Sequence, residues 1–311
     1  MTQKDLYVDD MYTNLDKMLP RILDTLNKTN LEFIFKELSN IKGPTIVTGV
    51  GGSSVVGEYL AKVLNKKNHI IAEFKFPREL LLTDLSEYEN VISISYSGRN
   101  IGVDASFNNN LKKYLLSGST REGVTNLQYV VEDEEFSFVS MAGTMIPLSI
   151  ILMYYLNDLD LIRDILSIRK EFNIDDSLIY EVLTSEKSKG ACAMLESTLV
   201  EGSLGALIIH EKYNYCHGRT LFNHFNPNTS TLIYMEDDSA LDSLFKDNLF
   251  STYKNVITID KKYDDDVVDD YYKSFMCLLL CMQISEKQGK DMSIKYPPEV
   301  SELMYGYKGE M

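Results

Sequence analysis

Short apolar runs alternate with helix-like periodicities along the first half of the chain. The run Thr45–Val50 suits a buried strand, and apolar residues from Val55 to Leu64 then recur at helical spacing. A glycine-rich turn joins the two, so the segment is typical of the start of a βαβ unit. Four further runs have the same strand-like character: Ile70–Ala72, Val91–Ser95, Tyr114–Leu116 and Leu127–Val131. We therefore expect an open parallel sheet with helices on both faces.

A second, shorter half repeats this alternation, with strand candidates at Ala206–Ile209, Thr231–Met235 and Val256–Ile259. Residues 159–189 are polar and charged, and we expect helices there that bridge the two halves. The predicted fold class is α/β, with two three-layer αβα units that each contain a parallel, doubly wound sheet. We place N-terminal helices at residues 1–40, the first domain at 41–158, the second domain at 159–290 and a C-terminal tail at 291–311.

Two helices have patterns that bear on burial. The helix at about Thr144–Asn157 is apolar on nearly every side, so it must be buried inside its domain or against another subunit. The last long helix begins among acidic residues that include Asp269 and Asp270. Acidic side chains are favoured at a helix N-terminus, so these aspartates are predicted to be solvated there.

The charge balance limits the partners. A net charge of −15 over 311 residues argues against nucleic acid but leaves a small phosphorylated ligand open. No secretory signal and no segment long enough to span a bilayer is visible, so we expect no membrane partner. The four cysteines lack Cys-x-x-Cys spacing, which favours a reduced, cytoplasmic protein. Neither a nucleotide-binding glycine motif nor metal-ligand spacing of histidines occurs, so we expect no cofactor and no metal.

Two turns rich in glycine and hydroxyl groups follow the first and third strand candidates. Gly49–Ser54 offers backbone N–H groups at a helix N-terminus, where the helix dipole favours an anion. Ser95–Asn100 repeats this design with two hydroxyls, a glycine, an arginine and an amide. Either turn alone is explained equally well by tight-turn geometry and helix capping. Together, at one edge of a parallel sheet, they predict a single anion site.

The turns resemble the phosphosugar-binding turns of the sugar isomerase (SIS) family, which includes the isomerase half of glucosamine-6-phosphate synthase. Phe138–Ser140 is similar to the segment whose serine lines the sugar pocket of that family, and the resemblance covers about residues 41–290. The family pattern Ser-x-Ser-Gly-Glu-Thr has Arg99 and Asn100 in its last two places here. The resemblance implies a set of residues that bind a sugar phosphate: Gly51, Gly52, Ser53, Ser54, Ser95, Ser97, Arg99, Asn100 and Ser140.

The second half holds a carboxylate and an imidazole, the groups that an aldose–ketose isomerisation requires. One base moves a proton through an enediol, and another group opens the sugar ring. Glu201 lies sixteen residues before His217, which is the spacing of the family's catalytic glutamate and ring-opening histidine. The resemblance therefore implies that Glu201 is the base and that His217 opens the ring. It also implies a homodimer, because the family's histidine reaches a pocket formed largely by another SIS unit.

Departures from the family pattern keep a second function open. Thr198 stands where relatives have a lysine, and Arg219 replaces the proline that follows the His-Gly pair. The leading hypothesis is the isomerisation of a sugar phosphate or aminosugar phosphate. The alternative is a non-catalytic phosphosugar-binding or regulatory protein. A third interpretation, a nucleotide binder, is disfavoured because its glycine fingerprint is missing.

Overall fold

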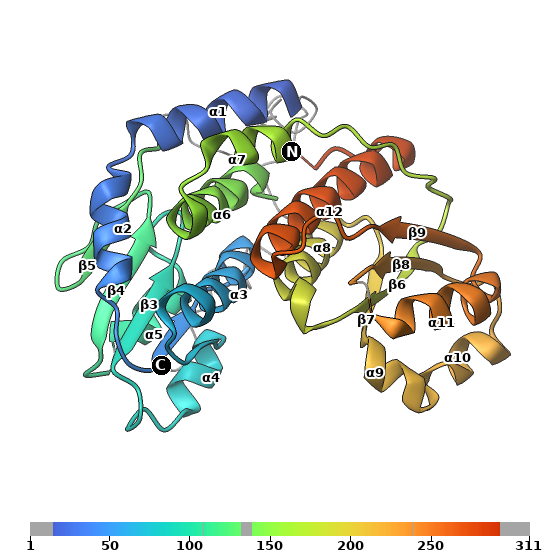
Figure 1. Ribbon diagram of the computed structural model, residues 1–311, viewed down its shortest axis with the longest axis horizontal. Coiled ribbons are helices and arrows are strands. Elements are labelled where there is room, and N and C mark those ends of the chain that lie inside the picture. The colour runs from blue at the N-terminus through green and yellow to red at the C-terminus, as the bar shows by residue number, and fades with distance from the viewer. Residues whose placement is uncertain (1–14, 108, 132–138, 238, 293–311) are drawn as a thin grey trace, which may run out of the picture. The chain divides into compact units, whose positions relative to one another are not determined.

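The computed structural model describes residues 15–107, 109–131, 139–237 and 239–292. The chain divides into two compact units: the described residues of the first end at Ser167, and the second comprises Ile168–Met292 (Figure 1). Each unit is an α/β fold built on one parallel sheet, which confirms the predicted fold class. Among the described helices, none has the length and apolar character needed to cross a membrane.

The first unit contains a five-stranded sheet in the order β2-β1-β3-β4-β5. Neighbouring strands pair in parallel, and Val47 of β1 lies opposite Ile92 of β3. All five apolar runs predicted in this half occur as strands, with ends displaced by up to three residues. The strands are β1 (Thr45–Thr48), β2 (Ala72–Phe74), β3 (Asn90–Ile94), β4 (Lys112–Ser117) and β5 (Thr125–Gln128).

Helices cover both faces of this sheet. The helix α3 (Gly52–Val63) connects β1 to β2 and packs so closely on one face that a side chain at Gly57 would clash with Phe74. Alternate strand residues point to the other face. There Ile46 and Val91 pack against α4 (Pro77–Leu82) and α5 (Ile101–Phe107).

The apolar helix predicted near residues 144–157 is α6 (Met141–Leu156). Every residue of Met141–Tyr154 is buried, which confirms the prediction of burial. The covering helices belong to the same unit: α3, α1 (Leu15–Lys28), α2 (Leu31–Ser39) and α7 (Leu159–Leu166). The apolar character of α6 is therefore accounted for without a second subunit.

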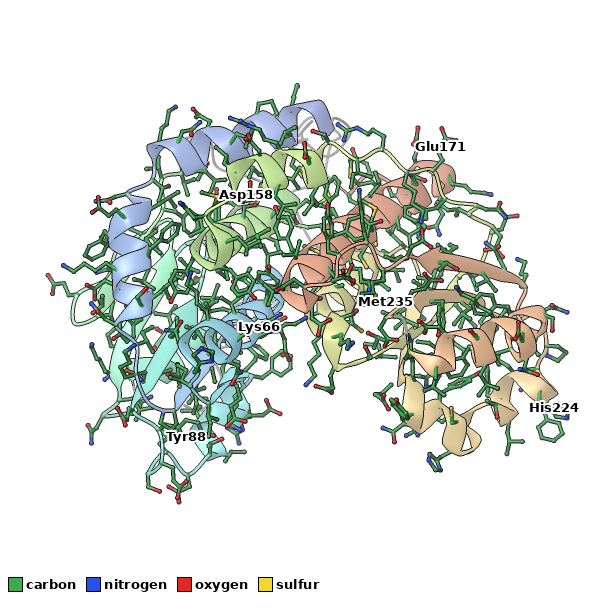
Figure 2. The ribbon with its side chains drawn as sticks, in the orientation of Figure 1. Lys66, Tyr88, Asp158, Glu171, His224 and Met235 are labelled. Carbon is green, nitrogen blue, oxygen red and sulfur yellow. The ribbon has the colours of Figure 1, made fainter. Side chains whose placement is uncertain are left out.

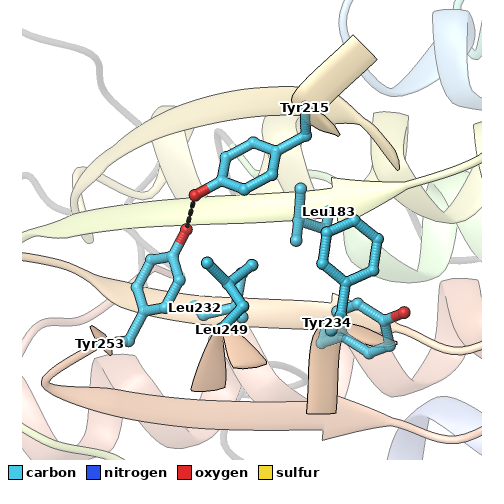
Figure 3. Close-up of a cluster of buried hydrophobic side chains, with 7 residues drawn as sticks. Leu183, Tyr215, Leu232, Tyr234, Leu249 and Tyr253 are labelled. Atoms are coloured by element: carbon cyan, nitrogen blue, oxygen red, sulfur yellow. Dashed lines mark hydrogen bonds between the residues drawn. The ribbon is translucent and has the colours of Figure 1, made fainter. Parts of the chain in front are cut away.

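The second unit contains a four-stranded parallel sheet in the order β7-β6-β8-β9. The helices α8 (Lys189–Glu201) and α12 (Asp266–Gln288) pack against each other, and Cys277 and Cys281 are buried on α12. A cluster of leucines and aromatic rings fills the space between the other face and α11 (Ala240–Asn248) (Figure 3). The remaining elements are β6 (Ile179–Thr184), β7 (Ala206–Glu211), β8 (Thr231–Met235), β9 (Asn255–Ile259), α9 (Lys212–Asn214), α10 (Leu221–Phe225) and single helical turns at Leu64–Asn68, Glu186–Ser188, Tyr215–Arg219 and Phe250–Thr252.

The prediction of bridging helices up to residue 189 is wrong for β6, which is a central strand of the second sheet. Its apolar pattern is interrupted by Glu181, which is only 1% exposed. The carboxylate of Glu181 accepts hydrogen bonds from Ser230, Asn223 and Tyr253. A buried carboxylate is tolerated when it is hydrogen-bonded in this way, but its charge made the strand look like a polar segment.

Candidate functional site

The two glycine- and hydroxyl-rich turns follow β1 and β3, which are neighbours in the first sheet. The chain continues from β1 to β2 on one side and then returns past β1 to β3 on the other. The turns therefore flank the point where the strand order reverses, the usual ligand position in such sheets. The first turn also packs against the start of α5, directly after the second turn, because a Cβ atom at Gly102 would lie 3.2 Å from the Cα of Gly49. The prediction that both turns share one sheet edge is confirmed.

The first turn brings the backbone into the left-handed region and then starts α3. Gly51 has a φ of +56°, which glycine adopts without strain. The Ser54 hydroxyl donates to the Gly51 carbonyl at 2.7 Å, so Ser54 closes the turn. The Ser53 hydroxyl has no hydrogen-bond partner within the described part of the chain. Ser53 is therefore the hydroxyl of this turn that remains available to a ligand.

The second turn is closed by its own polar side chains. Ser95 is 1% exposed, and its hydroxyl oxygen accepts a bond from the Asn100 N–H at 3.4 Å. The amide of Asn100 donates to the Ile94 carbonyl at 2.8 Å and accepts from the Val103 N–H at 3.1 Å. Asn100 thus caps α5, as its capping interpretation predicts. Ser97 and Arg99 are exposed and have no partner among the described residues.

The start of α6 joins the two turns. Ser140 precedes the helix, and its carbonyl accepts a bond from the Thr144 hydroxyl at 2.5 Å. That hydroxyl lies so near Gly52 that a Cβ atom there would be 2.4 Å away, which explains the need for glycine. Ser140 therefore belongs to the same edge as Gly52, whereas Phe138 lies outside the described residues.

Side chains of the protein itself occupy the corresponding edge of the second sheet. There α8 follows β6 as α3 follows β1, and β6 lies between β7 and β8 as β1 lies between β2 and β3. The Asp270 carboxylate accepts bonds from the N–H groups of Gly190 and Ala191 at 3.3 and 2.9 Å. The N-terminus of α8 thus has an internal anion.

A buried lysine completes this internal arrangement. The Lys273 ammonium donates to Ser188, after β6, and to the carbonyl of Glu236, after β8. It also pairs with Asp269 at 2.7 Å. Asp269 and Asp270 are 5% and 0% exposed, so the prediction that they are solvated is wrong. These side chains replace a ligand, which leaves the first sheet's edge as the open anion position.

Glu201 is the last residue of α8 and is partly buried. Burial raises the pKa of its carboxyl, a hydrogen bond from Ser197 lowers it, and the charge of Glu196 raises it, with a net increase. The Ser197 hydroxyl lies 3.1 Å from the carboxylate. No lysine or arginine pairs with Glu201 in the part of the chain that the structure describes. Thr198, at the family's lysine position, is buried and contacts Met194.

His217 lies in an exposed loop, and two buried residues before it fix the loop to the rest of the second unit. The Lys212 ammonium at its start is buried and pairs with Asp242 at 2.8 Å. Tyr215 is also buried, and its hydroxyl lies 2.8 Å from that of Tyr253 (Figure 3). Gly218 then has a φ of +96° and nothing within 4 Å of a Cβ position. His217 itself is exposed on the surface of the second unit.

Glu201 and His217 lie at opposite edges of the second sheet. Glu201 precedes the amino end of β7, and His217 follows its carboxyl end. The six residues of β7 span about 20 Å at the usual rise of a strand. The two side chains therefore do not meet within this unit. His224, farther along on α10, lies on the periphery of the unit (Figure 2), and no described group of histidine, cysteine and acidic side chains can hold a metal ion.

No protein-family model matches the chain, and no curated protein matches its sequence. Solved structures do match its fold. The C-terminal domain of glucosamine-fructose-6-phosphate aminotransferase from Francisella tularensis aligns with a TM-score of 0.70 at 12% identity, covering 96% of this chain and 100% of that one. Glucosamine-6-phosphate deaminase from Thermotoga maritima aligns with a TM-score of 0.67 at 16% identity, covering 91% and 98%.

Tagatose-6-phosphate ketose/aldose isomerase from Escherichia coli aligns with a TM-score of 0.66 at 14% identity, covering 93% of this chain and 94% of that one. At these identities the likeness is one of fold. The resemblance to the SIS family that the turns indicated is therefore confirmed at the level of the fold, over nearly the whole chain.

Proposed function

We propose that this protein binds a sugar phosphate at the carboxyl edge of the first sheet and interconverts its aldose and ketose forms. One observation carries the proposal: two hydroxyl-rich turns flank the switch point of the first sheet, whereas the same place in the second sheet is filled by Asp270 and Lys273. The named activities of the structural neighbours, which act on sugar phosphates, support this substrate class.

The residues at this edge divide into those that shape the turns and those that face a ligand. Ser54, Ser95 and Asn100 use their side chains to close the turns. The phosphate is proposed to bind the N–H groups at the start of α3 and the hydroxyls of Ser53 and Ser97, with Arg99 beside them at the edge of the site. Gly51 and Gly52 allow the backbone to approach the phosphate, and Ser140 lines the sugar side.

Glu201 is proposed to be the base that moves the proton between C1 and C2. A general base works best when its pKa approaches the working pH, and burial raises the pKa of Glu201. A lysine at position 198 would lower that pKa, so the threonine found there preserves basicity. The departure from the family pattern is therefore compatible with catalysis.

His217 is proposed to open the sugar ring in the site of a second copy. The loop that holds it is exposed, and the elements next to it in the chain, β7, α9 and α10, carry exposed apolar side chains. These are Ile208, Ile209, Tyr213, Leu221, Phe222 and Phe225, which are between 38% and 74% exposed. Apolar patches of this kind mark interaction surfaces, and a homodimer covers this one.

A binding experiment tests the phosphate site. A panel of sugar phosphates and the matching free sugars is added, and the melting temperature is measured, because a ligand that binds the folded state raises it. We expect a rise with at least one sugar phosphate and none with its free sugar. In Ser97→Ala the affinity for this sugar phosphate should fall about tenfold. The melting temperature of the unliganded variant should not change, since Ser97 has no partner among the described residues.

The matched variant Asn100→Ala should instead lower the melting temperature of the unliganded protein, because it removes the cap of α5. Equal stabilisation by the free sugars, or an unchanged affinity in Ser97→Ala, would overturn the phosphate site.

A further inference from the structure

A pocket of about 370 Å³ opens beside the second turn, between the loops that follow β3 and β4. Ser97 and Arg99 of the turn contribute to it, whereas its other lining residues belong to no site that the sequence motifs indicated. The loop after β4 supplies two more hydroxyls and a second arginine, at Ser119, Thr120 and Arg121. The pocket thus combines two guanidinium groups with three hydroxyls, which is the chemistry of an oxyanion site.

Backbone hydrogen bonds hold the two loops at a fixed separation. The Ser117 hydroxyl and the Gly118 N–H both donate to the Tyr96 carbonyl at 3.2 Å. The Ser119 N–H donates to the Ser117 hydroxyl oxygen at 3.0 Å. Asn126 then clamps the backbone of Arg121 from both sides, accepting from its N–H at 2.8 Å and donating to its carbonyl at 2.9 Å. The walls of the pocket are therefore built before any ligand binds.

The charges in the pocket are only partly neutralised. One nitrogen of Arg121 lies 3.1 Å from the Asp104 carboxylate, and its guanidinium stacks 4.7 Å from the Phe107 ring centre. These contacts orient the group but use few of its five N–H donors. Arg99 is exposed and has no partner among the described residues. Two arginines against one aspartate leave one positive charge in a chain whose net charge is −15.

We propose that this pocket binds a second acidic group of the ligand, so that the substrate is a sugar phosphate carrying a carboxylate or a second phosphate. The inference rests on the proposed function, because Ser97 is shared by the phosphate turn and the pocket. A ligand whose phosphate lies on the turn has its second oxyanion directed to Arg99 and Arg121. Guanidinium groups suit this task because they bind carboxylate and phosphate in a bidentate manner.

Calorimetric titration of the full chain with two ligand pairs tests the proposal. The first pair is glucose 6-phosphate and 6-phosphogluconate, which adds a carboxylate, and the second is fructose 6-phosphate and fructose 1,6-bisphosphate. We expect at least one acidic ligand to bind about tenfold more tightly than its monophosphate, as a charge-assisted hydrogen bond provides. The pair with the larger ratio identifies the acidic group.

Arginine variants show which side chain causes the tighter binding of the acidic ligand. In Arg121→Gln the affinity ratio should fall to about one. Arg169→Gln is the matched control, because Arg169 is an exposed arginine of the second unit and its loss changes the net charge equally. That variant should keep the ratio of the unmodified protein. If Arg121→Gln melts early because its contacts with Asp104 and Phe107 are lost, Arg99→Gln serves instead, since Arg99 has no internal contact to lose.

The outcomes separate the two proposals. Binding of the monophosphates with no preference for either acidic partner overturns the second subsite and leaves the proposed function in place. An equal loss of preference in Arg169→Gln also overturns it, because the effect is then one of overall charge. If none of the four compounds binds and no other sugar phosphate raises the melting temperature, the proposed function fails and the subsite fails with it.

Discussion

At the scale of single residues, the basicity of Glu201 follows from its immediate surroundings. Burial raises its pKa, and no cation offsets that effect among the described residues. Glu201→Gln keeps the side-chain shape but removes the proton acceptor, so turnover should fall about a hundredfold or more. Affinity for the sugar phosphate should change little, because the phosphate binds elsewhere. Glu196→Gln, an exposed glutamate on the same helix, is the matched control and should retain turnover at neutral pH. Equal turnover of Glu201→Gln and the control would contradict the assignment.

The same residue predicts a pH dependence with a definite sign. A base must be deprotonated to act, so kcat/KM should fall as the pH decreases through a pKa above the ordinary value of a glutamate. The charge of Glu196 contributes to that increase. Glu196→Gln should therefore move the acidic limb of the pH profile to lower pH. A limb that moves to higher pH in this variant would show that another group titrates there.

At the scale of elements, β6 depends on one buried carboxylate. Glu181 accepts bonds from Asn223, Ser230 and Tyr253, and its replacement by an apolar residue leaves these donors without a partner. Glu181→Leu should lower the free energy of unfolding by about 3 kcal/mol, whereas Glu181→Gln should cost less because its oxygen still accepts. Urea unfolding of both variants measures the difference. A leucine variant as stable as the unmodified protein would contradict this account of the strand.

The elements also show what the sequence could and could not predict. The strands of the first sheet were predictable because each contains part of a short apolar run, and the turns after β1 and β3 followed from their glycines and hydroxyls. β6 was missed because its central Glu181 is paired by residues that are distant in sequence. The burial of Asp270 was missed for the same reason, since its partners lie about eighty positions away.

At the scale of the whole molecule, the separation of Glu201 and His217 across β7 predicts shared sites between two copies. Each of the variants Glu201→Gln and His217→Ala should be inactive alone. After mixing and subunit exchange, a dimer with one chain of each kind contains one intact site, so activity should recover to about a quarter of the unmodified level. Light scattering before and after mixing confirms that the dimers persist. No recovery from exchanged dimers would place both residues in sites of a single chain, or remove one of them from catalysis.

The proposed isomerase must move a proton on a bound sugar phosphate. The most direct measurement is the incorporation of deuterium from D2O at C2 of that sugar phosphate, followed by NMR. We predict incorporation with the unmodified protein and its loss in Glu201→Gln. A sugar phosphate that binds at the first sheet's edge, while no bound sugar phosphate exchanges its C2 proton, would contradict the isomerase assignment and leave a non-catalytic phosphosugar-binding protein.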